Sequence, residues 1–247
     1  AAFGRYVRTD IAITGDARAV ARALSERLAE DRGYRTPEVR DRIAAGVEPP
    51  ADESGADGMD PRTLSRTIAE LVPADRTLVM DGGHFFGFPT QDIPVSEPSR
   101  YIFTMDFGSI GLGLGAAVGA AVAHPDRVTV TAIGDGGLMM SLGELDTAVR
   151  YELPILIIVY NDAAYGAELH FLRMSGIDDR EARFEMPALD RIARAMGAQG
   201  HAIRSIDDLT ALAPELADIK GPMLLDCRVT DRVRAVWLEE AFQRGTH

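Results

Sequence analysis

The 247-residue sequence has a single cysteine, Cys227, and no apolar run that approaches the roughly 20 residues of a membrane-spanning helix. One cysteine cannot form a disulfide within the chain, which is typical of proteins from a reducing cytoplasm. The first residues also lack the charged and then apolar pattern of a secretory signal peptide. These absences predict a soluble, cytoplasmic protein that does not contact a membrane.

Positive charge is scarce as well. Acidic residues number 38 against 26 lysines and arginines, the net charge is −12, and no basic run is present. Because such a surface repels phosphates, neither nucleic acid nor an anionic membrane is an expected partner. Hydrophobic residues make up 46% of the chain, which is enough for one large domain, or for one domain and a fragment of another.

The first 59 residues differ in composition from the rest. Residues 46–59 are rich in proline, glycine and acidic side chains, which is typical of a linker. Before them, Thr9–Thr14 has the pattern of a short strand, and Asp16 suits the N-cap of a following helix. The apolar residues spaced to form a buried face on this helix are Val20, Leu24 and Leu28.

From Asp60 onward, helical patterns alternate with short apolar strands. Asp60 suits the cap of a helix with Pro61 in its first turn. Strands of nearly continuous Val, Ile and Leu predict an α/β fold, a parallel sheet with helices on both faces in a Rossmann-like three-layer α/β/α domain. The expected strands lie near residues 77–80, 128–133, 155–160, 199–203 and 223–226. The expected helices lie near residues 111–123, 141–151, 187–196, 206–217 and 232–243.

Two neighbouring strands of this pattern end in aspartate. One runs into Gly134-Asp135-Gly136-Gly137, and the next ends in Asn161-Asp162. Their separation fits one strand–helix–strand crossover, and parallel neighbours place both carboxylates at the same edge of the sheet. Oxygen ligands beside glycine amides suit Mg²⁺ and a diphosphate, because Mg²⁺ prefers oxygen donors and shares them with phosphates.

Two other classes of protein compete with this interpretation. Residues 111–116 also fit a loose dinucleotide-binding fingerprint, which would favour a nicotinamide- or flavin-dependent oxidoreductase. Against it, the next strand ends in Gly-Asp-Gly, a pattern suited to a metal and phosphates. A non-catalytic cofactor-binding domain is a further alternative for the chain taken alone.

The same segments resemble the cofactor motif of thiamine-diphosphate (ThDP) enzymes, in which Gly-Asp-Gly is followed by Asn-Asn or Asn-Asp. Residues 161–166, NDAAYG, are similar to the "NN-x-x-Tyr-Gly" ending of the acetohydroxyacid (acetolactate) synthase-like branch. Residues 108–120 are similar to the glycine-rich segment of that branch. The resemblance covers about residues 60–230 and is specific because the motifs occur together.

The resemblance implies a domain organisation. Residues 60–247 would be the carboxyl-terminal ThDP- and Mg²⁺-binding domain, residues 46–59 a linker and residues 1–45 a remnant of the middle domain. The amino-terminal pyrimidine-binding domain would be absent. The glutamate that activates ThDP belongs to that domain in the family, so no catalytic residue is assigned here and we expect the chain alone to be inactive.

The resemblance also implies site residues. The Mg²⁺ ligands would be Asp135, Asp162 and the main-chain carbonyl of Ala164, with Asp162 standing where Asn is commoner. Ile110 would support the bent form of the cofactor. The residues expected at the cofactor are His84, Gly108, Ser109, Ile110, Gly134, Asp135, Gly136, Gly137, Asp162, Ala164, Tyr165 and Gly166.

Two of these positions have further expected roles. The amides of Gly136 and Gly137 would approach phosphate oxygens at the start of a helix. His84 would lie near the diphosphate and thiazolium, as a neutral hydrogen-bond donor or as a proton shuttle near neutral pH.

For the complete enzyme, the resemblance implies a ThDP-dependent transferase or lyase that acts on a 2-oxo acid. Acetolactate synthase-like decarboxylation with carboligation is the first expectation, and simple decarboxylation of a 2-oxo acid or an acyl-CoA is the alternative. The family also implies a homodimer or homotetramer with sites shared between subunits. FAD occurs in the middle domain of some branches and cannot be inferred from residues 1–45.

Overall fold

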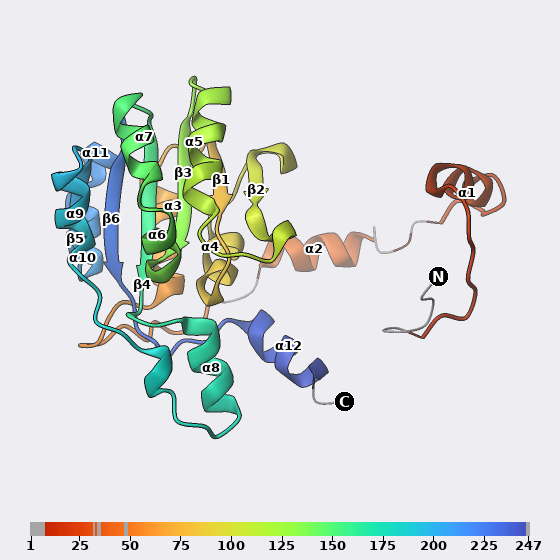
Figure 1. Ribbon diagram of the computed structural model, residues 1–247. Helices are drawn as coiled ribbons and strands as arrows, with labels where there is room; N and C mark the ends of the chain where they lie inside the picture. The colour runs from red at the N-terminus through yellow and green to blue at the C-terminus, as the bar shows by residue number, and fades with distance from the viewer. Residues whose placement is uncertain (1–7, 32, 34–35, 47–48, 246–247) are drawn as a thin grey trace. The chain divides into compact units, whose positions relative to one another are not determined.

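The computed structural model divides into two units at the boundary between Pro50 and Ala51. This boundary falls inside residues 46–59, the predicted linker. The residues whose structure is described are 8–31, 33, 36–46 and 49–245 (Figure 1).

The first unit contains two helices, α1 (Ala17–Ser25) and α2 (Pro37–Ala45). Asp16 caps α1 as predicted, since its Oδ1 accepts a hydrogen bond from Ala19 N at 2.9 Å. The predicted buried face of this helix is wrong, because no described residue of α1 is buried. The expected strand at Thr9–Thr14 is also wrong, and these residues are exposed. A segment of this length has too few apolar residues to build a core by itself.

The second unit contains a six-stranded sheet in its described residues, with the order β2-β1-β3-β4-β6-β5. All neighbouring strands are parallel. The strands are β1 (Arg76–Met80), β2 (Tyr101–Phe103), β3 (Val128–Gly134), β4 (Ile155–Asn161), β5 (Gln199–Ile203) and β6 (Met223–Arg228). The five predicted strands are confirmed, whereas β2, a three-residue edge strand, was not predicted.

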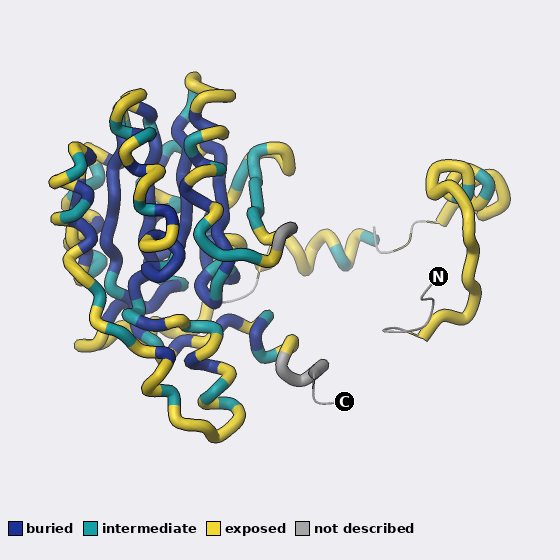
Figure 2. Tube along the Cα trace, in the orientation of Figure 1, coloured by how far each residue is buried: buried dark blue, intermediate teal, exposed yellow. Residues whose placement is uncertain are grey.

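Both faces of the sheet are covered. Along β4, Leu156 and Ile158 belong to one buried cluster, and Ile155 and Ile157 belong to another. Figure 2 shows the central strands as buried, with exposure on the outer sides of the helices. This double burial explains the continuous apolar character of the strands and confirms the three-layer α/β/α fold.

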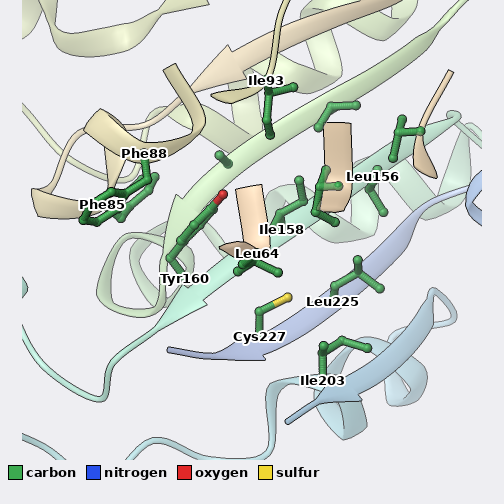
Figure 3. Close-up of a cluster of buried hydrophobic side chains, with 14 of the residues drawn as sticks. Leu64, Phe85, Phe88, Ile93, Leu156, Ile158, Tyr160, Ile203, Leu225 and Cys227 are labelled. Atoms are coloured by element: carbon green, nitrogen blue, oxygen red, sulfur yellow. The ribbon is translucent and has the colours of Figure 1, made fainter. Parts of the chain in front are cut away.

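Different helices cover the two faces. The first face is covered by α3 (Pro61–Leu71), α4 (Gly87–Asp92), α10 (Ile206–Ala211) and α11 (Ala213–Leu216). The second face is covered by α5 (Gly113–Ala123), α6 (Asp135–Ser141), α7 (Glu144–Arg150) and α9 (Leu189–Ala195). Figure 3 shows the core on the first face, where Leu64 of α3 packs near Ile158 and Tyr160.

Several predicted helices differ in extent. The helix expected at 141–151 is two helices, because α6 begins at Asp135 and α7 begins only after Gly143. The helix expected at 206–217 is interrupted at Leu212, just before Pro214, and forms α10 and α11. Two helices beyond the carboxyl ends of the strands are α8 (Gly166–Met174), which was not predicted, and α12 (Val236–Gly245) (Figure 1).

The part of the predicted linker after Pro50 packs on the second unit. Met59 forms a parallel bridge with Val229, and Thr230 N donates to Met59 O at 2.9 Å. Thr230 Oγ1 donates to Asp57 Oδ2 at 2.5 Å. In the described part of the chain, no helix has the length and apolar character of a membrane span.

Candidate functional site

A cavity of about 210 Å³ lies at the carboxyl ends of β1, β3 and β4. β1 and β3 are neighbours in the sheet although β2 lies between them in sequence. After β1 the chain packs Phe85 and Phe88 on the first face, whereas after β3 helix α6 packs Leu138 on the second face. Since the two connections leave on opposite faces, a crevice opens between them.

The cavity brings together nearly all of the residues that the sequence singled out. The predicted site residues in its wall are His84, Gly108, Ile110, Gly134, Asp135, Gly136, Gly137, Asp162, Ala164, Tyr165 and Gly166. Ser109 is the exception among the predicted residues, and its hydroxyl donates to the carbonyl of Ile110 at 3.0 Å. The site is therefore assembled from four segments that are distant in sequence.

Three glycines in the wall leave no room for a side chain. A Cβ added to Gly137 would lie 2.5 Å from Asp81 Oδ2, and one added to Gly136 would lie 2.8 Å from Tyr165 Cε1. A Cβ added to Gly166 would lie 2.6 Å from Asp162 Oδ2. Their backbones can therefore approach neighbouring groups more closely than any other residue would allow.

Asp135 begins α6 and is 2% exposed. Its Oδ1 accepts a hydrogen bond from Gly136 N at 2.7 Å, and its Oδ2 accepts one from Ala163 N at 2.8 Å. Burial raises the pKa of Asp135 to about 6, although these two hydrogen bonds favour the ionised form.

Asp162 follows β4 and faces the same cavity. Its Oδ1 accepts a hydrogen bond from Ala164 N at 3.1 Å. Burial of the carboxylate, followed by repulsion from Asp135, raises the pKa of Asp162 to about 8. Two carboxylates that repel one another in a buried site would be stabilised by a bound cation.

The loop after Asp162 is held by residues that the sequence did not single out. Ala163 has a φ of 55°, in the left-handed region. Phe184 N donates to Ala163 O at 3.1 Å, and Tyr165 N donates to Ala182 O at 2.8 Å. Among the described residues, no hydrogen bond to the carbonyl oxygen of Ala164 is found.

The available donors define which metal would fit. Within the described residues, no cluster of three or more His, Cys, Asp or Glu side chains could hold a metal. Asp135, Asp162 and the carbonyl of Ala164 offer only oxygen, which suits Mg²⁺ when phosphate oxygens or water complete its coordination. The N–H of Gly136 is already used in the hydrogen bond to Asp135 Oδ1.

Asp81, which directly follows β1, was not predicted as a site residue. It is fully buried, and its carboxylate accepts hydrogen bonds from Gly111 N at 2.9 Å and from Leu112 N at 3.2 Å. Burial raises its pKa while these amides oppose the shift. Asp81 thus holds the glycine-rich segment against β1, and its strand-end position before two glycines was the signal that could have identified it.

His84 lies in the cavity wall with 6% of its surface exposed. Its Nε2 accepts a hydrogen bond from Ala235 N at 2.8 Å, and its ring centroid lies 4.2 Å from that of His170. Burial lowers the pKa of His84 to about 3. His84 is therefore neutral near pH 7, which favours the predicted donor role over the proton shuttle.

The segment from Val229 to Trp237 also contributes to the wall, with Val229, Thr230, Val233 and Trp237. The indole of Trp237 donates to His84 O at 3.2 Å and stacks on Phe86, with ring centroids 4.6 Å apart. No motif marks this segment in the sequence, because its place in the wall depends on the chain folding back over the cavity.

The chain matches the family model described as "Thiamine pyrophosphate enzyme, C-terminal TPP binding domain" over residues 81–227. Thiamine pyrophosphate is another name for ThDP. The match begins at Asp81 and includes both strand-end aspartates of the cavity.

Similar proteins agree with this family. The chain is 28% identical to the acetolactate synthase isozyme 3 large subunit of Escherichia coli (strain K12), over 92% of this chain and 41% of that protein. It is also 28% identical to a sulfoacetaldehyde acetyltransferase of Alcaligenes xylosoxydans xylosoxydans, over 88% of this chain and 41% of the relative. The chain thus spans about two fifths of the length of these curated relatives.

Among solved structures, the chain is similar to the thiamine diphosphate-dependent 4-hydroxybenzoylformate decarboxylase of Rhodococcus jostii RHA1. The TM-score is 0.67 with 26% identity, over 74% of this chain and 35% of that one. The family match covers more than half of the chain and includes most of the residues that line the cavity. The chain therefore belongs to the thiamine pyrophosphate enzymes and contains their C-terminal TPP-binding domain.

Proposed function

We propose that this chain supplies the diphosphate- and Mg²⁺-binding half of the active site in an enzyme that acts on a 2-oxo acid. The reaction proposed is acetolactate synthase-like, with decarboxylation followed by carboligation. The observation that carries the proposal is the pair Asp135 and Asp162, whose pKa values are both raised in a glycine-lined cavity. When bound, ThDP supplies an electron sink for cleavage of the bond next to the carbonyl.

In this proposal the residues of the chain bind and orient the cofactor. Asp135, Asp162 and the carbonyl of Ala164 hold Mg²⁺, and the amide of Gly137 approaches the diphosphate. The expected contact from Gly136 is replaced by its hydrogen bond to Asp135 Oδ1. Ile110, which lies in the cavity wall, supports the cofactor from one side. The apolar rings of Phe85 and Trp237 exclude water from the same cavity.

Titration calorimetry tests the cofactor assignment. We expect ThDP to bind in the presence of Mg²⁺ and to bind much more weakly after chelation with EDTA, because the carboxylates repel a diphosphate that lacks a metal. NADH and FAD serve as controls for the dinucleotide alternative. Binding of ThDP that is indifferent to Mg²⁺, or binding of NADH in its place, would contradict the proposal.

Simple decarboxylation is a second candidate, supported by the similarity to the 4-hydroxybenzoylformate decarboxylase. The two reactions differ in their products. The complete enzyme supplied with pyruvate should form acetolactate if carboligation follows decarboxylation, and acetaldehyde if the intermediate is protonated instead. A complete protein that binds ThDP but consumes no 2-oxo acid would support the non-catalytic alternative.

We also propose that the complete enzyme is a homodimer or homotetramer, with each ThDP site shared between subunits. The motivation is the resemblance to a family in which a second domain completes the site. Light scattering on the active enzyme tests this expectation. An active monomer would rule out a site shared between subunits.

A further inference from the structure

The two ring nitrogens of His84 have different surroundings. The main-chain N–H of Ala235 donates to Nε2 at 2.8 Å. A ring nitrogen that accepts a hydrogen bond carries no proton, so the proton of the neutral ring lies on Nδ1. The Nδ1 atom faces Gly166, since a Cβ on that glycine of the cavity wall would lie 3.6 Å from it. Among the described residues, Nδ1 has no hydrogen-bond partner of its own.

The surroundings of His84 also oppose a second proton on the ring. The ring is buried and lies against His170, and the positive charge of Arg234 is near. Burial, followed by these two groups, lowers the pKa of His84. The Nδ1–H tautomer is therefore the form that the fold selects.

The segment 229–237, which carries the Ala235 amide, is anchored at three points. Thr230 N donates to Met59 O at 2.9 Å. Asp231 forms ion pairs with Arg183 at 2.6 Å and with Arg173 of α8 at 3.2 Å. Trp237 donates to the carbonyl of His84. The Ala235 amide is thus held in register with the imidazole rather than placed by a single contact.

We propose that the segment 229–237 locks His84 in the Nδ1–H tautomer and so makes it a fixed hydrogen-bond donor to an acceptor oxygen of the bound ligand. The inference rests on the proposed function and assigns a positioning role to a segment that lies outside the cofactor motifs. The acceptor oxygen belongs to the cofactor's diphosphate or to the carboxylate or carbonyl of the substrate. A ring locked in this way discriminates against ligands that offer a donor at the same point.

The tautomer itself is measured by ¹⁵N NMR on the protein with labelled histidine. The chain has five histidines, and the His84→Gln variant identifies the His84 signals by difference. We expect a protonated Nδ1 and an unprotonated Nε2 near pH 7. A protonated Nε2, in either the other tautomer or the doubly protonated ring, would overturn the proposal.

Two variants of Ala235 test the origin of the lock. Ala235→Pro removes the N–H donor and should give a mixture of tautomers, whereas Ala235→Gly keeps the donor and should preserve the Nδ1–H form. An unchanged tautomer in a folded Ala235→Pro variant would contradict the role of the segment. If Ala235→Pro does not fold, the spectrum of the unaltered protein and of Ala235→Gly still decides the tautomer.

Two variants of His84 locate the acceptor oxygen. His84→Leu has no donor, whereas the amide of His84→Gln can both accept from Ala235 and donate to the ligand. His84→Leu should weaken binding of inorganic pyrophosphate with Mg²⁺ by about tenfold or more if the diphosphate is the acceptor. If the substrate is the acceptor, pyrophosphate binding is unchanged and kcat/KM of the complete enzyme for the 2-oxo acid falls by a similar factor. His84→Gln should restore either loss.

The proposal fails if His84→Leu changes neither quantity, or if His84→Gln is as damaging as His84→Leu. These outcomes differ from the result expected if the proposed function is wrong. If the proposed function is wrong, the unaltered protein does not bind ThDP with Mg²⁺, whatever the tautomer of His84.

Discussion

The ends of β1 and of the β3–β4 pair both carry buried aspartates, but the two regions use them differently. Asp81 directs both carboxylate oxygens to amides of the glycine-rich segment and lies outside the cavity wall. Asp135 and Asp162 share one cavity, and the charge of Asp135 adds to the effect of burial in raising the pKa of Asp162. Burial of a strand-end aspartate therefore does not by itself identify a metal ligand. The difference between the two regions is the second carboxylate, because Asp162 lies close enough to Asp135 for its pKa to be raised by that charge.

The largest expected effect is the loss of metal-dependent binding in Asp135→Ala. The variant removes one oxygen ligand, so ThDP affinity in the presence of Mg²⁺ should fall by more than about a hundredfold. Titration calorimetry measures it, with Asp146→Ala on the exposed side of α7 as the control. If the variant kept its Mg²⁺-dependent affinity for ThDP, Asp135 would not be a metal ligand.

Asp81→Ala should lower the stability of the fold more than it weakens ThDP binding. It leaves the amides of Gly111 and Leu112 without their acceptor, which should lower the free energy of unfolding by about 2 kcal/mol or more. Urea denaturation measures the change, again against Asp146→Ala. If Asp81→Ala were fully stable but did not bind ThDP, Asp81 would have a binding role rather than the structural role that we assign to it.

The pH dependence of stability should reveal the raised pKa values of Asp135 and Asp162. A carboxyl group whose pKa is higher in the folded state than in the unfolded state binds protons more tightly when folded, so stability falls as pH rises between these values. With pKa values of about 6 and about 8 against 3.8 unfolded, the loss extends from about pH 4 to about pH 8.

Between pH 6 and pH 8 the unliganded protein should lose roughly 2 to 3 kcal/mol of stability through this pair. Urea denaturation at both pH values measures the loss, and Asp162→Asn should reduce it. Mg²⁺ should oppose the loss, because it binds the ionised carboxylates. Equal pH dependence in Asp162→Asn and the unaltered protein would show that the pKa of Asp162 is not raised in the folded protein.

The smallest effect is expected for ThDP binding in Asp162→Asn. The amide of the variant keeps an oxygen for the metal but attracts the metal less than a carboxylate does. The variant also removes a negative charge that repels the diphosphate. That repulsion costs roughly 3 kcal/mol at about 6 Å and an effective dielectric near 20. Since these effects oppose each other, the affinity for Mg²⁺ and ThDP together should change by less than about tenfold. Asp162→Ala should be far worse. If Asn were as damaging as Ala in the same titrations, the carboxylate would have a role beyond coordination.

Five of the six strands in the described residues, the order of layers and the two aspartates of the cavity could be predicted from local patterns. Continuous apolar runs such as Ile155–Tyr160 require burial on both faces, and that requirement predicts the parallel sheet. Once the sheet is parallel, residues that follow adjacent strands must meet at one edge, which brings Asp135 and Asp162 together. The glycines beside them carried a second signal, because close approach leaves no space for a Cβ.

Other expectations failed where the outcome depends on distant neighbours. The strand at Thr9–Thr14 was wrong because a strand forms only against a partner, and β2 was missed because three edge residues carry little pattern. The apolar positions of α1 predicted burial, but the described residues of the first unit supply no core to cover them.

The α/β class, the two strand-end aspartates and the glycines beside them can all be identified from the sequence, because they follow from periodicity and from side chains at the ends of strands. Only the tertiary structure decided that Asp81 holds residues 111 and 112, and that the segment 229–237 reaches His84. Both arrangements join segments far apart in the chain through main-chain amides. Because every residue except proline carries the same amide, no side-chain pattern records which of them will be the partner.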